Sequence, residues 1–155
     1  MDKLKAGIAV YNTQTDEVAL MRMVDGQVCF TSAKMSQGGE VEIEDIGMNL
    51  ADCREATTAE KIAMQKAMNN QNLVWDSYRK TIQESRFTPK NGDYVRVSIL
   101  GEDIISGVFK CFDDNGDIVM YCQLRKDGTL GYSQYEVIGA KENYQFQTIG
   151  SHARL

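Results

Sequence analysis

Alternating apolar and polar residues predict short strands over the first 46 residues of the chain. Val41 and Ile43 alternate with Glu42 and Glu44, which is typical of a strand with one buried face and one acidic face. The dipeptide Asp25-Gly26 favours a tight hairpin, because both residue types tolerate a positive φ. The predicted strands are Lys5–Tyr11, Glu17–Val24, Gln27–Ala33 and Glu40–Ile46.

The apolar spacing changes to a helical period after residue 56. Thr57 and Glu60 fit a capping box, in which the threonine hydroxyl and the glutamate carboxylate each accept a backbone N–H. Four consecutive asparagine and glutamine residues at 69–72 are expected to end the helix. Their side chains compete for backbone hydrogen bonds, and asparagine tolerates the left-handed region. The apolar stripe consists of Ala59, Ile62, Ala63 and Ala67, widened by Met64 and Met68. We predict one helix between these two signals.

Residues 73–85 allow two interpretations. In the first, Leu73–Trp75 and Lys80–Gln83 pair as a hairpin that turns at Asp76-Ser77. In the second, the same residues form another helix. The hairpin is slightly favoured. Trp75 is expected to anchor this connecting segment against a β module, because a tryptophan buries a large apolar surface.

The last third carries the strongest strand signals. Asn115-Gly116 and Asp127-Gly128 are hairpin turns between runs of alternating character. The predicted strands are Tyr94–Leu100, Ile104–Phe112, Asp117–Leu124 and Thr129–Tyr135. The side chains predicted to face the core are Val95, Val97, Ile99, Ile105, Phe109, Cys111, Ile118, Met120, Cys122 and Leu124. So many short antiparallel strands in so few residues indicate a bent SH3-like barrel or meander.

The same alternation predicts an apolar outer face on this last module. If the core-facing residues above point inward, the residues between them point outward. This outer face holds Val108, Lys110, Phe112, Val119, Tyr121 and Gln123, and Tyr132 and Tyr135 extend it. One interpretation is that the connecting helix covers the face, because a broad apolar helix needs a partner. The other is that the face binds a second protein or an identical subunit.

The chain therefore divides into three predicted segments. Residues 1–56 form an N-terminal acidic β module, 57–88 a connector of a helix and a hairpin, and 89–155 a C-terminal SH3-like β module. Residues 26–47 and residues 116–139 share an order of features: a glycine, a strand, a glycine turn and a second strand, at similar spacings. This internal similarity supports two related β modules. The predicted fold class is α+β, with two small SH3-like antiparallel barrels or meanders joined by the connector.

Composition agrees with a globular protein. The 155 residues are 43% hydrophobic and 25% charged, which is too apolar for a disordered chain. The net charge is −5, and 5 basic against 10 acidic side chains in residues 1–56 account for it. No apolar run reaches the length of a membrane helix. A protein that binds nucleic acid non-specifically needs a cationic face. Of the three segments only the connector has a positive net charge, which is +2.

The cysteines and the single histidine argue against a metal site. Cys29, Cys53, Cys111 and Cys122 form no C-x-x-C pair, and His152 lies near the C-terminus. The sequence begins without a secretion signal, so we expect a cytoplasmic protein with free thiols and no cofactor. An EF-hand alignment of the run 113–117 would place sulfur where calcium needs oxygen, so that run is predicted to be a polar hairpin tip.

Signatures of catalysis are equally weak. The sequence holds no phosphate-binding glycine loop and no G-x-S-x-G elbow, and His152 stands alone near a chain end. A hydrolase built on carboxylates alone could use Glu42 or Glu44 with Glu102 or Asp103, but nothing in the pattern selects such a pair. We therefore expect a protein that is not an enzyme.

Two motifs resemble elements of a known group of proteins. Residues 54–61, followed by Trp75-Asp76 and Lys80, are similar to an R-x-A-T-x-x-E-K … W-(D/N) … K element, and residues 116–130 to a G-D-I-x-x-Y-C-x-L-x-x-D-G-x-L signature. Both resemble small uncharacterised β-module proteins of Bacteroides-type gut bacteria and their phages. The resemblance covers 54–82 and 89–132, about half the chain. It implies a helix and hairpin attached to a β module, with no catalytic residue, although the connector here precedes the signature.

These observations favour a non-enzymatic protein–protein interaction or assembly protein, encoded by a phage or a mobile element. The residues expected to bind a partner, or a second copy in a homo-oligomer, are Phe112, Val119, Tyr121 and Tyr132. One alternative is a small-barrel protein that binds nucleic acid through the basic connector, at Lys61, Lys66, Arg79 and Lys80. The other alternative is the carboxylate-based hydrolase.

Overall fold

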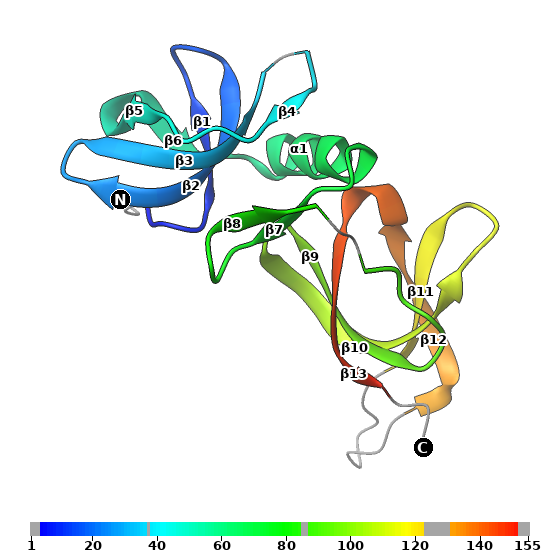
Figure 1. Ribbon diagram of the computed structural model, residues 1–155. Coiled ribbons are helices and arrows are strands. Elements are labelled where there is room, and N and C mark those ends of the chain that lie inside the picture. The colour runs from blue at the N-terminus through cyan, green and yellow to red at the C-terminus, as the bar shows by residue number, and fades with distance from the viewer. Residues whose placement is uncertain (1–3, 37, 85–86, 123–130, 152–155) are drawn as a thin grey trace. The chain divides into compact units, whose positions relative to one another are not determined.

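The chain falls into two units, residues 1–86 and 87–155 (Figure 1). The computed structural model describes residues 4–36, 38–84, 87–122 and 131–151. The boundary between the units lies two residues before the predicted start of the C-terminal module at 89. The helix and the hairpin that were predicted as a connector belong to the first unit.

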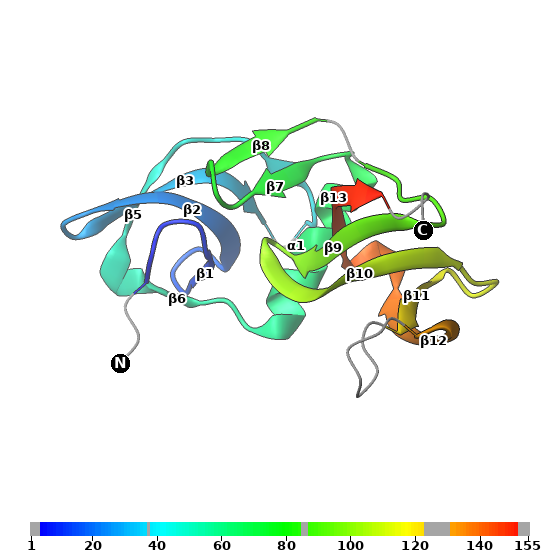
Figure 2. The same cartoon turned by 90° about the horizontal axis from the view of Figure 1, so that it is seen from below.

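A curved antiparallel sheet of six strands forms most of the first unit (Figures 1 and 2). Its order is β4-β3-β2-β1-β6, and β5 also pairs with β3. The strands are β1 (Ala9–Asn12), β2 (Glu17–Asp25), β3 (Val28–Met35), β4 (Val41–Glu42), β5 (Gly47–Asn49) and β6 (Cys53–Glu55). The β2–β3 hairpin confirms the turn signal at Gly26, which has φ +61°. The predicted fourth strand is mostly irregular, and β5 and β6 were not predicted.

The concave side of this sheet holds a small apolar core. Val10, Ala19, Met21, Cys29 and Met48 are buried together, with Cys53 packed against them. The first three come from β1 and β2, whereas Cys29 lies in β3 and Met48 in β5. Side chains from strands at both ends of the sheet therefore contact one another in this core. The 3-10 helix η1 (Leu50–Asp52) connects β5 to β6.

The predicted helix is confirmed as α1 (Thr58–Asn70). Thr57 is its N-cap: the Thr57 hydroxyl accepts the Glu60 N–H at 3.2 Å, and the Glu60 carboxylate accepts the Thr57 N–H at 2.8 Å. The chain leaves the helix through Asn72, whose φ of +57° is left-handed, as the amide-rich run predicted. The helix contacts β2 and β4, so it is part of the first unit's packing.

The hairpin interpretation of residues 73–85 is also confirmed. Strands β7 (Val74–Asp76) and β8 (Thr81–Gln83) pair antiparallel, and the Asp76 carboxylate accepts the N–H groups of Tyr78 and Arg79 in the turn. Trp75 is completely buried and donates its indole N–H to the Gly7 carbonyl at 3.3 Å. A buried tryptophan with a bonded N–H ties the hairpin to the N-terminal segment of the same unit.

The second unit is an open antiparallel sheet of five strands in the order β12-β11-β10-β9-β13. Its strands are β9 (Asp93–Ile99), β10 (Glu102–Phe112), β11 (Asp117–Cys122), β12 (Gly131–Ala140) and β13 (Gln145–Ser151), with the 3-10 helix η2 (Lys141–Asn143) before β13. The core consists of Val95, Val97, Phe109, Ile118, Met120 and Phe146. Five of these six residues were predicted to face the core; Phe146 was not, because β13 was not predicted.

A β-bulge in β10 reverses the predicted facing of two residues. Phe109 lies opposite Met120 and Cys111 lies opposite Val119, so Lys110 is the extra residue. Beyond it the alternation is shifted by one position. Phe112 therefore packs against the core, 4.9 Å from Phe109 between ring centroids, and Cys111 shares the face of Val119. The prediction that Phe112 lies on the outer face and Cys111 on the core face is wrong.

The predicted fold class is also wrong. The described residues form thirteen strands and a single α-helix, so the protein is mostly β rather than α+β. The sheets are antiparallel, as expected, but none closes into an SH3-like barrel. In the second unit β13 pairs with β9 and β12 with β11, which leaves these two strands at opposite ends of the sheet order. Short strands and tight turns are common to barrels and open meanders, so the pattern could not tell them apart.

The position of Phe112 predicts a stability effect. Phe112→Ala should lower the free energy of unfolding by about 2 to 3 kcal/mol, because it removes a ring that contacts both Phe109 and Phe146. Ile104→Ala, at an exposed position of the same strand, should cost less than about 1 kcal/mol. Urea unfolding of both variants measures the difference; equal costs would contradict this placement of Phe112.

Candidate functional site

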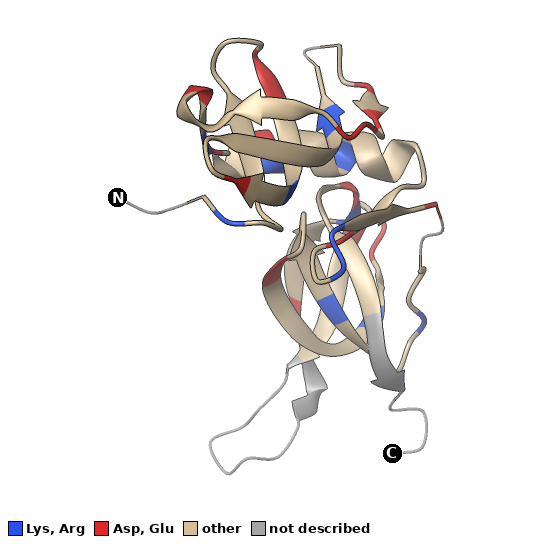
Figure 3. Ribbon diagram, turned by 60° about the vertical axis from the view of Figure 1, so that its left-hand side comes forward, with Lys and Arg blue, Asp and Glu red and all other residues tan. Residues whose placement is uncertain are grey.

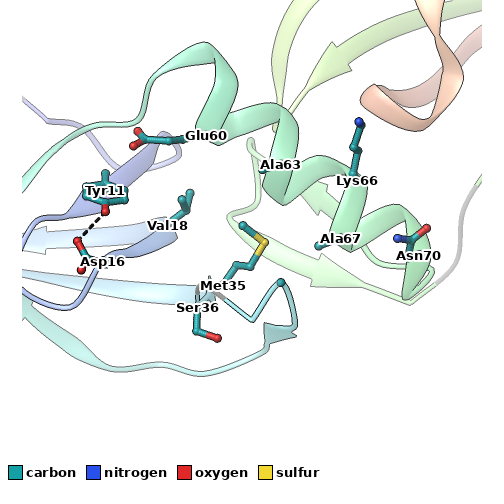
Figure 4. Close-up of a pocket in the computed structure, with 11 residues that line it drawn as sticks. Tyr11, Asp16, Val18, Met35, Ser36, Glu60, Ala63, Lys66, Ala67 and Asn70 are labelled. Carbon is teal, nitrogen blue, oxygen red and sulfur yellow. Dashed lines mark hydrogen bonds between the residues drawn. The ribbon is translucent and has the colours of Figure 1, made fainter.

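Two surface features are candidates for a functional site, one in each unit. The first is an open groove of about 420 Å³ between α1 and the strands β1 to β3 of the first unit (Figure 4). Val18, Met35 and Ala67 give it an apolar floor, and all three are buried. Tyr11, Asp16 and Glu60 line one end, while Lys66 and Asn70 extend from the helix at the other.

The polar end of the groove is held together by mutual contacts. Arg54 stacks on the Tyr11 ring at 4.4 Å and donates two hydrogen bonds to the Glu60 carboxylate, both at 2.8 Å. β6 pairs with β1 so that Arg54 lies directly opposite Tyr11, which makes the stacking possible. The Tyr11 hydroxyl donates to the Asp16 carboxylate at 2.7 Å. The capping glutamate of α1 is thereby joined to the β1–β2 turn.

These contacts set the protonation states at the groove. The Arg54 guanidinium lowers the pKa of Glu60 to about 2, and the Thr57 N–H adds to that effect. The hydrogen bond to Asp16 raises the pKa of Tyr11, because the phenolate would lose it. Glu60 is thus held ionised and Tyr11 protonated. The lining offers a carboxylate already paired with arginine and a phenol already bonded, which suits binding or structural support better than proton transfer.

The second candidate is the outer face of β11 and β12, defined here as Val119, Tyr121, Tyr135 and Val137. Val119 lies directly opposite Val137 and Tyr121 directly opposite Tyr135, so the four side chains share one side of the sheet. Tyr135 and Val137 are each 58% exposed, whereas Val119 is only 5% exposed. The Lys110 ammonium lies 4.8 Å from the centre of the Tyr135 ring. The bulge residue of β10 therefore reaches this face.

The residues predicted to bind a partner lie in different surroundings. Val119 and Tyr121 lie on the predicted side of β11, but Val119 is buried rather than exposed. Tyr121 is half-buried, and its hydroxyl donates to the Asn91 side-chain oxygen at 3.3 Å. Phe112 belongs to the core cluster and not to this face. Tyr132 is in β12, but its side chain lies outside the described part of the structure.

Val137 was missed because the predicted strand ended at Tyr135, and β12 continues to Ala140. The alternation of Tyr135 and Val137 with Glu136 was the available signal. The groove was also missed, since its residues come from β1, β2, β3 and α1 and share no motif. Only the capping box, which places Glu60, was visible in the sequence.

The four basic residues of the nucleic-acid alternative do not form a common exposed face. Lys61 is 6% exposed and lies 3.6 Å from the Glu55 carboxylate. Lys66 is five residues further along α1, so it points to a different side of the helix. Arg79 and Lys80 are in the β7–β8 turn, where Arg79 lies 3.9 Å from Asp76. Figure 3 shows basic and acidic residues interspersed within each unit.

The carboxylates of the hydrolase alternative divide between the units. Glu42 and Glu44 belong to the first unit, where Glu44 lies 3.7 Å from Lys34. Glu102 and Asp103 belong to the second, where Asp103 lies 3.4 Å from Arg96. Within the described ranges, no three His, Cys, Asp or Glu side chains are grouped so that they could hold a metal ion.

Comparison with known proteins gives no family. The sequence matches no protein-family model, and no curated protein is significantly similar to it. Among the residues that the structure describes, no helix has the length and apolar character needed to cross a membrane.

The Arg54–Glu60 pair predicts a pH-dependent contribution to stability. The folded protein holds the pKa of Glu60 at about 2 against an ordinary 4.5, so ionised Glu60 stabilises the fold above pH 4.5. That contribution is lost as the pH falls from about 4.5 to 2. It should stay below about 1 kcal/mol, since 45% of the Arg54 side chain is exposed.

The test compares the free energy of unfolding of the wild type with that of Glu60→Gln. Glutamine keeps the capping hydrogen bond and removes only the charge. Urea unfolding should show wild type to be the more stable at pH 7, with the difference shrinking at pH 3. A difference that stays constant between the two pH values would refute the role of the ion pair.

Proposed function

We propose that this chain is a non-enzymatic protein–protein interaction and assembly protein that binds through the edge strand β12 and its side chains on the outer face. The observation that carries the proposal is the position of β12, which is the last strand in the order of its sheet. An edge strand presents unpaired backbone N–H and C=O groups, and these are a template for a strand of another chain.

The other ends of the two larger sheets are poor templates. In the first unit β4 has two residues and β6 has three, and β6 carries Arg54 and Glu55. Short and charged edge strands discourage strand addition. In the second unit β13 carries Gln145 and Gln147, and the Gln147 side chain accepts hydrogen bonds from Arg96. β12 has ten residues and exposes Tyr135 and Val137. Among the side chains that the structure describes, β12 is thus the edge strand that combines length with exposed apolar residues.

The chemistry of the face fits a protein interface. Tyrosine is enriched where proteins bind one another, since its ring buries apolar area and its hydroxyl stays hydrogen-bonded. Tyr121 and Tyr135 lie side by side across β11 and β12, with Val119 and Val137 next to them. Lys110 beside the Tyr135 ring adds one positive charge in a chain of net charge −5. The face is therefore apolar and locally less acidic than the chain average.

The partner is a second copy of the chain. Two β12 strands can pair antiparallel around a two-fold axis, which is the commonest symmetry of homodimers. In that arrangement the two sheets become one continuous sheet, and the outer faces of both copies lie on the same side. The mass in solution, measured by light scattering over a range of concentrations, tests this directly: the proposal requires a dimer, and a monomer at every concentration would overturn it.

Substitution of the exposed residues should weaken association. Tyr135→Ser together with Val137→Ser removes the two apolar side chains of the edge strand, and we expect dimerisation to weaken by roughly tenfold or more. Sedimentation equilibrium gives the dissociation constant, and circular dichroism checks that the variant is folded. The matched control is Tyr78→Ser, since Tyr78 is 90% exposed but lies in the β7–β8 turn of the first unit. Equal dissociation constants for the double variant and the control would contradict this assignment of the face.

A further inference from the structure

Two cysteines of the first unit lie close together across its core. Cys29 is in β3 and Cys53 is the first residue of β6, and their sulfur atoms are 4.0 Å apart. Along the hydrogen-bonded path β3-β2-β1-β6 these strands are separated by two others. A second route is shorter: β5 pairs with β3, Met48 lies directly opposite Cys29, and η1 leads from β5 to Cys53. The chain thus returns β6 to the side of β3, where the two sulfur atoms meet.

Other side chains make contacts across the same core. The Asn12 amide, in β1, donates to the Met48 sulfur in β5 at 3.3 Å, and both residues are buried. The Cys53 thiol also donates to the Asn49 carbonyl at 3.6 Å, across the turn of η1. Cys53 is thus held in place by its own loop and by the packed core, and its sulfur points at Cys29.

We propose that Cys29 and Cys53 are a disulfide-forming pair, which a peroxide converts into a covalent link between β3 and β6. A disulfide needs sulfur atoms about 2 Å apart, so the two thiols must approach by roughly another 2 Å, which rotation of the side chains can supply. The link would join strands at separate positions of the sheet and fix its curvature.

The reaction proceeds in two balanced steps. The Cys53 thiolate attacks one oxygen of hydrogen peroxide; the O–O bond breaks, hydroxide leaves, and Cys53 becomes a sulfenic acid. The Cys29 sulfur then attacks the Cys53 sulfur, the S–O bond breaks, and the thiol proton leaves with the departing hydroxyl as water. Overall two thiols lose two protons and two electrons, and one peroxide becomes two waters.

Solvent exposure determines which of the two cysteines is oxidised first. Cys29 is completely buried, whereas Cys53 is half-buried, so the oxidant meets Cys53 first. Burial raises the pKa of the Cys53 thiol to about 12 and also raises that of Cys29. Little thiolate is then present at neutral pH, and the reaction is slow there. Its rate should rise as the pH increases from 7 to 9.

The test uses the full chain with Cys111→Ser and Cys122→Ser, so that Cys29 and Cys53 are the only thiols left. The protein is treated with hydrogen peroxide at pH 7 and pH 9, under native conditions. Intact mass should fall by two hydrogens, and peptide mapping should join the Cys29 peptide to the Cys53 peptide. The melting temperature of the oxidised protein should rise by about 5 °C or more and return after reduction.

A third substitution supplies the control. With Cys29→Ser added, the same treatment should leave Cys53 oxidised by oxygen addition, with no cross-link and no rise in melting temperature. Three results would overturn the proposal: oxygen addition to Cys53 with no link while Cys29 is present, links only between separate chains, or a Cys29–Cys53 link that forms only in denaturant.

Discussion

One extra residue in β10 determines how the second unit is built. The bulge at Lys110 shifts the alternation of the strand, so that Phe109 and Phe112 both face the core although they are three residues apart. Together with Phe146 they form three edge-to-face ring contacts, with centroids 4.9 to 6.4 Å apart. The same shift turns Cys111 outward beside Lys110, and the Lys110 ammonium lies 4.8 Å from the centre of the Tyr135 ring. The aromatic core and the composition of the outer face therefore depend on a single irregularity in pairing.

Features set by neighbouring residues were predictable from the sequence. The capping box needs only Thr57 and Glu60, and the β2–β3 hairpin only the turn at Asp25-Gly26, so both were predicted correctly. Features set by distant pairing were not. A bulge is visible only when β10 is aligned with β11, and β13 gains its partner from β9, about fifty residues earlier. Barrel closure failed as a prediction for the same reason, because it depends on which strands meet at the ends of a sheet.

The candidate site was partly predictable on the same terms. Between Val119 and Tyr121 the pairing of β11 is regular, so simple alternation placed both on the correct side of the sheet, although it could not show that Val119 is buried. Phe112 lies beyond the bulge, where alternation gives the opposite face. The groove in the first unit combines Tyr11, Arg54 and Glu60 from three separate elements. The sequence element of residues 54–61 contains Arg54 and Glu60 but does not indicate Tyr11, which the pairing of β6 with β1 places beside Arg54.

The end strands of the two sheets differ in length and charge, and the proposed interaction surface follows from that difference. In the first unit the end strands β4 and β6 are short or charged. Contacts across the core, from Asn12 to Met48 and from Cys29 to Cys53, stabilise the curved sheet. In the second unit β13 pairs with β9, and β12, a strand of ten residues that exposes Tyr135 and Val137, lies at the other end of the sheet. A sheet whose own strands satisfy both edges has no need of a partner, whereas an edge such as β12 stays exposed to aggregation unless a second chain covers it. In the proposed dimer, pairing at β12 would give the second unit the edge protection that short, charged strands give the first.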